Sequence, residues 1–252
     1  MTFFSDTYYM FVRWMKKLVR NPILLFFSLL QPIIFLLLFT QLFSSFGVLI
    51  GANYTLFATA GIVLQNAFSS AFQSGTAVVD DIRSGFLTKV LATPASRASI
   101  LLGRLLSDAF RVFAQTLIIL LLAFGLGVFP TTGIPGYILI LITVAFFGLA
   151  WSGISLALGL RTKSAETVFG IAGTLTFPLL FMSTALMRQE LMPTWMANVS
   201  TYNPISIAVN AIRDLIMKGY VWGSFSEAYA VISLIGILTL GATFYEFRKV
   251  VS

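Results

Sequence analysis

Asp80-Asp81-Ile82-Arg83-Ser84-Gly85-Phe86-Leu87-Thr88-Lys89-Val90-Leu91-Ala92-Thr93-Pro94-Ala95-Ser96-Arg97 is a charged island in an otherwise apolar sequence. Residues 53–79 before the island and residues 112–160 after it carry no formal charge. Uncharged, mostly apolar runs of this length are typical of bilayer crossings, which need about 20 residues per helix. The sequence therefore predicts that the island is a loop between two membrane spans.

The composition of the whole chain agrees with a membrane location. The 252 residues are 58% hydrophobic and 10% charged, whereas soluble domains are about a quarter charged. The chain has neither Cys nor His, which excludes disulfides, a His-containing catalytic triad and Cys/His metal sites. It also lacks a Gly-x-x-x-x-Gly-Lys-Ser/Thr phosphate loop. We therefore expect no enzyme activity, no metal and no bound cofactor for this chain. The formal charge of +7 is distributed as a membrane topology requires, so no nucleic-acid partner is expected either.

The charge-free segments predict an all-α membrane protein with six spans in a single transmembrane domain, residues 1–252. Residues 3–20 combine aromatic and basic side chains at helical spacing, which predicts an amphipathic helix in the headgroup region. Residues 188–223 contain Pro, Trp and Tyr typical of a membrane interface, so short external re-entrant helices are expected there. The six predicted spans are residues 22–43, 53–79, 104–129, 137–160, 167–187 and 228–245.

The basic residues predict the orientation of the chain in the membrane. Twelve Lys and Arg lie in the N-terminal segment, the 80–104 loop, the 161–166 loop and the C-terminus, against three in residues 188–223. Cytoplasmic loops carry an excess of Lys and Arg. Both termini and the loop at residues 80–103 are therefore expected in the cytoplasm, and residues 188–223 outside.

Three charged residues lie near the start of the third predicted span. Arg104, Asp108 and Arg111 are spaced i, i+4 and i+7, so they share one face of a helix. The spacing predicts a structural ion pair near the cytoplasmic face of the membrane.

Several short motifs occur in an order that one transporter family shares. The island contains Asp81-Ile82-Arg83-Ser84-Gly85 and Leu91-Ala92-Thr93-Pro94-Ala95-Ser96-Arg97, followed by Leu102-Gly103-Arg104. The external segment contains Leu191-Met192-Pro193-x-Trp195, Tyr202-Asn203-Pro204 and Ala211-x-Arg213. Over essentially its whole length, the chain resembles permease subunits of type-2 ABC exporters, closest to the daunorubicin-type drug-resistance branch. Neither of the two Glu that the family often has, in Arg-Glu-x-Gly and near position 88, is present here.

The resemblance implies partners and residue roles. The 80–103 loop would couple the chain to a separate ATP-binding cassette subunit that binds ATP and Mg, through Asp81, Arg83, Gly85, Thr93, Pro94 and Arg97. External helices would form an exit gate with Pro193, Trp195, Asn203, Pro204 and Arg213, and Asn198 and Asn203 are expected to be accessible from outside. Two copies, or this chain and a related permease, would enclose a pathway in the cell membrane of a prokaryote.

An amphipathic drug-like or lipid-like molecule fits such a pathway. The candidate lining residues are polar or aromatic side chains within the predicted spans, although packing between helices explains them equally well. They are Gln65, Asn66, Phe68, Gln73, Phe113, Gln115, Phe177 and Met182.

Three other functions compete with drug export. A secondary carrier of small amphiphiles needs ion-coordinating or titratable groups at mid-membrane and usually internal repeats, and neither is evident in the sequence. An intramembrane enzyme acting on lipid is disfavoured by the absence of His and of a paired-carboxylate site. Export of a polysaccharide or a lipid-linked glycan stays open as an alternative substrate class.

Overall fold

The regular structure of the chain is helical. The computed structural model describes residues 3–42 and 54–251, and no strand occurs within these ranges. A short 3-10 helix, Gln189–Leu191, precedes the last three α-helices. The predicted all-α fold class is confirmed. The α-helices are α1 (Phe3–Val19), α2 (Pro22–Leu42), α4 (Tyr54–Arg83), α5 (Phe86–Leu91), α6 (Arg97–Gly125), α7 (Gly133–Thr162), α8 (Ala165–Phe181), α9 (Thr194–Tyr202), α10 (Pro204–Met217) and α11 (Trp222–Val251).

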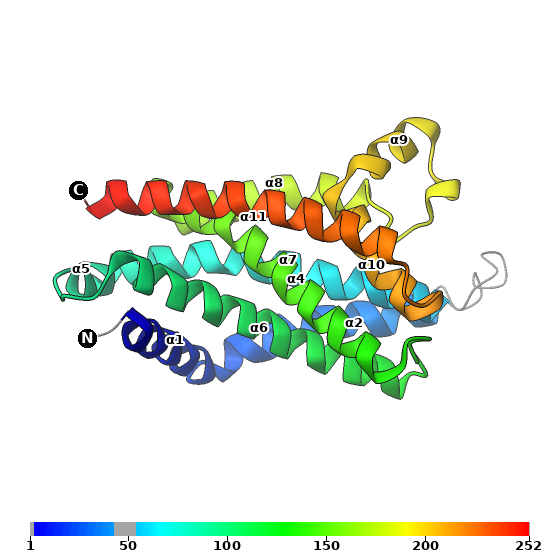
Figure 1. Ribbon diagram of the computed structural model, residues 1–252, viewed down its shortest axis with the longest axis horizontal. Helices are drawn as coiled ribbons and strands as arrows, with labels where there is room; N and C mark the ends of the chain where they lie inside the picture. The colour runs from blue at the N-terminus through cyan, green and yellow to red at the C-terminus, as the bar shows by residue number, and fades with distance from the viewer. Residues whose placement is uncertain (1–2, 43–53, 252) are drawn as a thin grey trace.

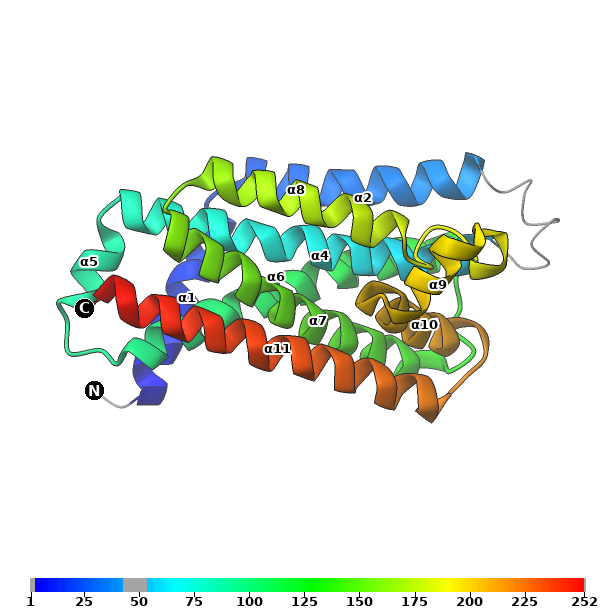
Figure 2. The same ribbon diagram turned by 90° about the horizontal axis from the view of Figure 1, so that it is seen from above.

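The long helices run side by side along one axis (Figure 1). The short helix α5, the start of α1 and the end of α11 lie together at one end, which we call the α5 end (Figure 1). Helices α9 and α10 lie at the opposite end, which we call the α10 end (Figure 2). This arrangement agrees with the prediction that the island and both termini share one side of the membrane.

Four helices of the described chain are long and apolar enough to cross a membrane: Leu25–Leu42, Arg97–Gly125, Gly133–Thr162 and Trp222–Lys249. Helix α4 has 30 residues but is less apolar, because it carries Gln, Asn and Ser along its length. Helix α8 is apolar but has only 17 residues. The chain is a multi-pass membrane protein.

Several element boundaries differ from the predicted ones. The third span was predicted from residue 104, but α6 already begins at Arg97, because the Ser96 hydroxyl accepts a hydrogen bond from the Ser99 amide at 3.1 Å and caps the helix. The fifth span was predicted to reach residue 187, whereas α8 ends at Phe181. The sixth was predicted as residues 228–245 and lies inside the longer α11. Helices α4 and α6 extend into the predicted 80–103 loop from both sides, so the connection between them is residues 84–96, and α5 lies within it.

Helices α4 and α7 form the centre of the bundle and approach each other closely. A Cβ added to Gly75 would lie 2.2 Å from the carbonyl oxygen of Ser155, and one added to Gly159 would lie 2.5 Å from that of Gly75. The Ser155 hydroxyl accepts a hydrogen bond from the Gly75 amide and donates one to the Phe72 carbonyl, both at 2.7 Å. Small residues thus allow backbone-to-backbone contact, as is common between membrane helices.

Candidate functional site: a charge network at the α5 end

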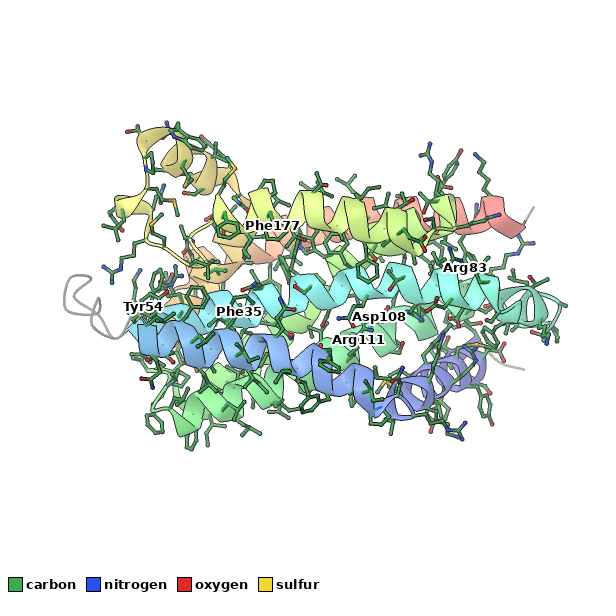
Figure 3. The ribbon with its side chains drawn as sticks, turned by 180° about the vertical axis from the view of Figure 1, so that it is seen from behind. Phe35, Tyr54, Arg83, Asp108, Arg111 and Phe177 are labelled. Carbon is green, nitrogen blue, oxygen red and sulfur yellow. The ribbon has the colours of Figure 1, made fainter. Side chains whose placement is uncertain are left out.

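A network of charged side chains and one tryptophan, buried except at Arg13 and Lys17, joins α1, α4 and α6 near the α5 end. Figure 3 shows two of its members, Asp108 and Arg111, next to each other inside the bundle. We call this group the charge network. Its members are Arg13, Trp14, Lys17, Asp81, Arg104, Asp108 and Arg111.

Asp81 connects α1 to the rest of the network. Its carboxylate accepts hydrogen bonds from the Trp14 indole and from the Lys17 ammonium, each at 2.9 Å. The guanidinium of Arg13 lies 3.7 Å from the carboxylate and that of Arg104 lies 3.5 Å from it. The Asp81 side chain is only 3% exposed. It was predicted to serve coupling to the ATPase, but it points into the protein, so any such role acts through α1 and α6.

The surroundings of Asp81 keep it ionised. Burial alone would raise the pKa of this carboxyl, but the hydrogen bonds from Trp14 and Lys17, with the charge of Arg104, lower the pKa below its usual value. The sequence analysis missed Trp14 and Lys17. Lys17 lies 64 positions and Trp14 67 positions from Asp81, so no local pattern links them.

Arg104, Asp108 and Arg111 share one face of α6, as their spacing predicts. The Asp108 carboxylate lies 3.2 Å from Nε of Arg104 and 3.1 Å from an NH2 nitrogen of Arg111. Both arginines also donate hydrogen bonds to backbone carbonyls of α4: Arg104 to Ser74 at 3.1 Å and Arg111 to Ser70 at 2.8 Å. The ion pairs therefore hold α6 to α4.

The polar contacts continue toward the middle of the bundle. The Ser74 hydroxyl donates a hydrogen bond to Asp108. The Ser70 hydroxyl donates to the side-chain oxygen of Gln115 at 2.5 Å, and the Gln115 amide donates to the Ser28 hydroxyl at 2.9 Å. Helix α2 is thereby connected to α6 and, through Ser70, to α4.

The island itself forms a short helix that is fixed to the bundle. Gly85 adopts a left-handed conformation, with φ of 68°, and starts α5 with a sharp turn. Leu87 and Val90 are buried in an apolar cluster whose other members lie mainly on α1, α4, α6, α7 and α11. The outward-facing residues of the island include Arg83, Thr93, Pro94 and Arg97. Of these, Arg83 has an exposed ion pair with Glu166 at 3.4 Å, which contributes little to stability.

The candidate pathway residues fall into two groups. Phe68 is buried in an aromatic cluster with Phe72, Phe147 and Trp151, and the Gln115 side chain is hydrogen-bonded in the core. Both side chains are thus packed between helices within this chain. Of the others, Gln65, Asn66 and Gln73 line a narrow polar pocket between α2 and α4, where Asn66 is buried and the two glutamines are partly buried. Phe113 and Met182 are partly buried, and Phe177 projects outward from α8 with 63% exposure (Figure 3).

The predicted gate residues lie at the α10 end. Pro193 precedes α9 and Pro204 starts α10, so the two prolines divide the external segment into short helices. The Asn203 amide donates hydrogen bonds to the carbonyls of Leu179 at 2.7 Å and Met182 at 3.0 Å, which fixes α10 to the end of α8. Asn203 is therefore buried, contrary to the expectation that it is accessible. The other two gate residues are the exposed Trp195 and the partly buried Arg213.

The burial of Asn203 gives a labelling prediction for the orientation of the chain. Asn198 and Tyr202 are exposed on α9, so single cysteines at these positions should react rapidly with a membrane-impermeant maleimide added outside intact cells. A cysteine at Asn203 should react much more slowly. Since the natural chain has no Cys, mass spectrometry or a gel shift reads each position alone. Reaction of Asn198→Cys only after the cells are opened would invert the proposed topology.

Comparison with known proteins shows which family this chain resembles. A model described as ABC-2 type transporter matches residues 5–217. The daunorubicin resistance ABC transporter permease protein DrrB1 of Streptomyces coeruleorubidus is 31% identical over 203 residues, which cover 81% of this chain and 72% of the relative. The putative transport permease ycf38 of Cyanophora paradoxa is 31% identical over 220 residues, which cover 84% and 74%.

A more distant relative carries a similar description. The probable doxorubicin resistance ABC transporter permease protein DrrC of Mycobacterium tuberculosis is 24% identical over 213 residues, which cover 83% of this chain and 76% of the relative. The fold is that of a multi-pass helical membrane protein, and the relatives are transport permeases. The chain belongs to the ABC-2 type transporter family.

Proposed function

We propose that this chain is the membrane-spanning subunit of an ABC exporter that moves an amphipathic, drug-like molecule out of a prokaryotic cell. A separate ATPase subunit would bind ATP and Mg and dock on the α5 end. The observation that supports this most directly is the island: a short helix with an outward-facing polar surface and an inward-facing side, Leu87 and Val90, buried in an apolar cluster with residues of the long helices. The proposed topology has six spans, with α4 and α8 among them, and both termini in the cytoplasm.

The island can transmit force because it is rigidly attached. Leu87 and Val90 pack in the same apolar cluster as Trp14 of α1 and Phe247 of α11. Asp81, near the start of the island, is hydrogen-bonded to Trp14 of α1, and Arg104, which follows the island, is hydrogen-bonded to Ser74 of α4. A rigid-body displacement of α5 by a partner would therefore move the ends of α1, α4 and α6 together.

A second permease chain would complete the pathway. Helices α2, α4 and α8 lie on one face of the molecule (Figure 3), and α2 and α8 expose large apolar side chains, among them Phe27, Leu38, Phe169 and Phe177. Gln65 and Gln73 of α4 are only half-buried on this side of the bundle. A homodimer or a heterodimer packed on this face would enclose polar and aromatic groups together, which suits an amphipathic substrate. The names of the daunorubicin and doxorubicin resistance relatives support an amphipathic, drug-like substrate as well.

The docking proposal is tested by reversing one charge on the island. Arg97 is exposed at the start of α6 and takes part in no ion pair among the described residues. In membranes that contain the cognate ATPase subunit, Arg97→Glu should reduce co-purification by at least about tenfold, since a like-charge contact in an interface costs several kcal/mol. The yield of folded permease should not change.

Lys16→Glu is the matched control, because Lys16 is an exposed cation on α1 near the same end. It should leave co-purification within about twofold of the natural chain. Full recovery of the ATPase with Arg97→Glu, together with unchanged transport, would remove Arg97 from the docking surface. ATP hydrolysis by the purified permease alone would contradict the assignment of a separate ATPase.

A further inference from the structure

Two arginines at the α10 end lie beside the same aromatic ring without a carboxylate between them. The guanidinium carbon of Arg213 lies 3.7 Å from the centre of the Phe57 ring, and that of Arg188 lies 5.9 Å from it. Within the described ranges, neither arginine has a carboxylate oxygen within 4.0 Å. This contrasts with the charge network, where each arginine has an acidic partner.

Most of the N–H donors of this pair are available. Arg213 donates one hydrogen bond to the Thr184 carbonyl at 2.6 Å and one to the Asn210 side chain at 3.0 Å, and these bonds fix its position. Its Nε is buried without a partner among the described residues. The Arg188 side chain has no hydrogen bond or ion pair with a described residue. Since each guanidinium has five N–H donors, only two of the ten in this pair have an acceptor among the described residues.

The two arginines open onto a cleft of about 530 Å³ at this end of the molecule. Two acidic residues also line it, Asp214 and Glu190. Asp214 is already neutralised by Lys218 at 2.9 Å and accepts a hydrogen bond from the Ser224 hydroxyl at 2.6 Å. The lining therefore carries three cations and two anions, and its excess positive charge lies with Arg188 and Arg213.

We propose that this cleft binds a phosphate-type oxyanion at the exit of the pathway. Paired guanidinium groups match the oxygen geometry of phosphate, and hydrogen bonds between charged partners are about twice as strong as neutral ones. The anion would bridge Arg188 and Arg213 and remove their mutual repulsion. It can come from an anionic phospholipid of the outer leaflet or from free phosphate.

The test measures binding to the purified permease and does not depend on transport or on the ATPase. Native mass spectrometry would count bound molecules for the natural chain, Arg188→Gln and Arg161→Gln, each with short-chain phosphatidylglycerol, inorganic phosphate or short-chain phosphatidylcholine. Arg188 is the residue to change because its side chain makes no hydrogen bond with the described residues, so its loss breaks none of these. Arg161, an exposed cation on α7 with one 3.9 Å ion pair, is the control.

Arg188→Gln should weaken phosphatidylglycerol binding by about tenfold, while Arg161→Gln leaves it unchanged. Binding of phosphatidylglycerol but not of inorganic phosphate would identify a lipid headgroup as the ligand, and binding of both would identify the oxyanion alone. Arg213→Lys, which keeps the charge and loses the planar fork, should also weaken binding. Equal binding by the natural chain and Arg188→Gln would overturn the proposal and leave the export function untouched.

Discussion

Asp81→Ala is expected to lower the free energy of unfolding by about 3–5 kcal/mol and to reduce the yield of folded protein sharply. Loss of one partner from a buried ion pair leaves the other charges uncompensated, which costs about this much. Here Asp81 is 3% exposed, accepts hydrogen bonds from Trp14 and Lys17, and forms an ion pair with Arg104 at 3.5 Å. Thermal unfolding in detergent, followed by size-exclusion chromatography, measures the effect.

Asp80→Ala is the matched control for this experiment. Asp80 precedes Asp81 directly, but its side chain is exposed and makes no ion pair with the described residues, so its loss should change stability by no more than about 0.5 kcal/mol. Asp81→Asn separates the two roles of the carboxylate, since an amide can still accept the hydrogen bond from Trp14 but carries no charge. Equal melting temperatures for Asp80→Ala and Asp81→Ala would show that Asp81 does not hold α1 to the bundle.

Much of the architecture was predictable because it follows from local properties of the chain. Charge-free segments mark apolar helices, and the i, i+4, i+7 spacing of Arg104, Asp108 and Arg111 places them on one helix face whatever the rest of the fold does. Pro193 and Pro204 interrupt helices for reasons that lie within the backbone itself. These features can be predicted without knowing which helices are neighbours.

The contacts between helices were not predictable from such patterns. Asp81 was assigned to the ATPase surface because it belongs to a charged motif, yet the structure turns it toward Trp14 and Lys17 of α1. Phe68 was a reasonable pathway residue by composition, but α4 places it against Phe147 and Trp151 of α7. Which face of α4 meets α7 depends on close contacts at Gly75 and Gly159, and one sequence alone does not pair those positions.

The second large effect is expected for Asp108→Ala, and it follows from the net charge of the charge network. The network has four cationic and two anionic side chains, so its formal charge is +2. Asp108→Ala raises this charge to +3 and leaves Arg111 with no carboxylate partner. Arg104→Ala lowers the charge of the network to +1. In that variant Asp108 still forms its ion pair with Arg111, and Asp81 still forms its ion pair with Lys17. Asp108→Ala should therefore destabilise the protein by about 3–5 kcal/mol, and clearly more than Arg104→Ala.

A double substitution shows whether the uncompensated charge or the lost packing causes the destabilisation by Asp108→Ala. In Asp108→Leu with Arg111→Leu, the network keeps its charge of +2, and the pair at 3.1 Å is replaced by apolar groups. Replacing a whole buried ion pair in this way is often neutral or stabilising, so the double variant should recover most of the folded yield that Asp108→Ala loses. The Ser70 carbonyl loses its hydrogen bond from Arg111, which limits the recovery by about 1 kcal/mol. Equal yields for Asp108→Ala and Arg104→Ala, with no recovery in the double variant, would show that the ion pairs are solvated and do not hold α6 to α4.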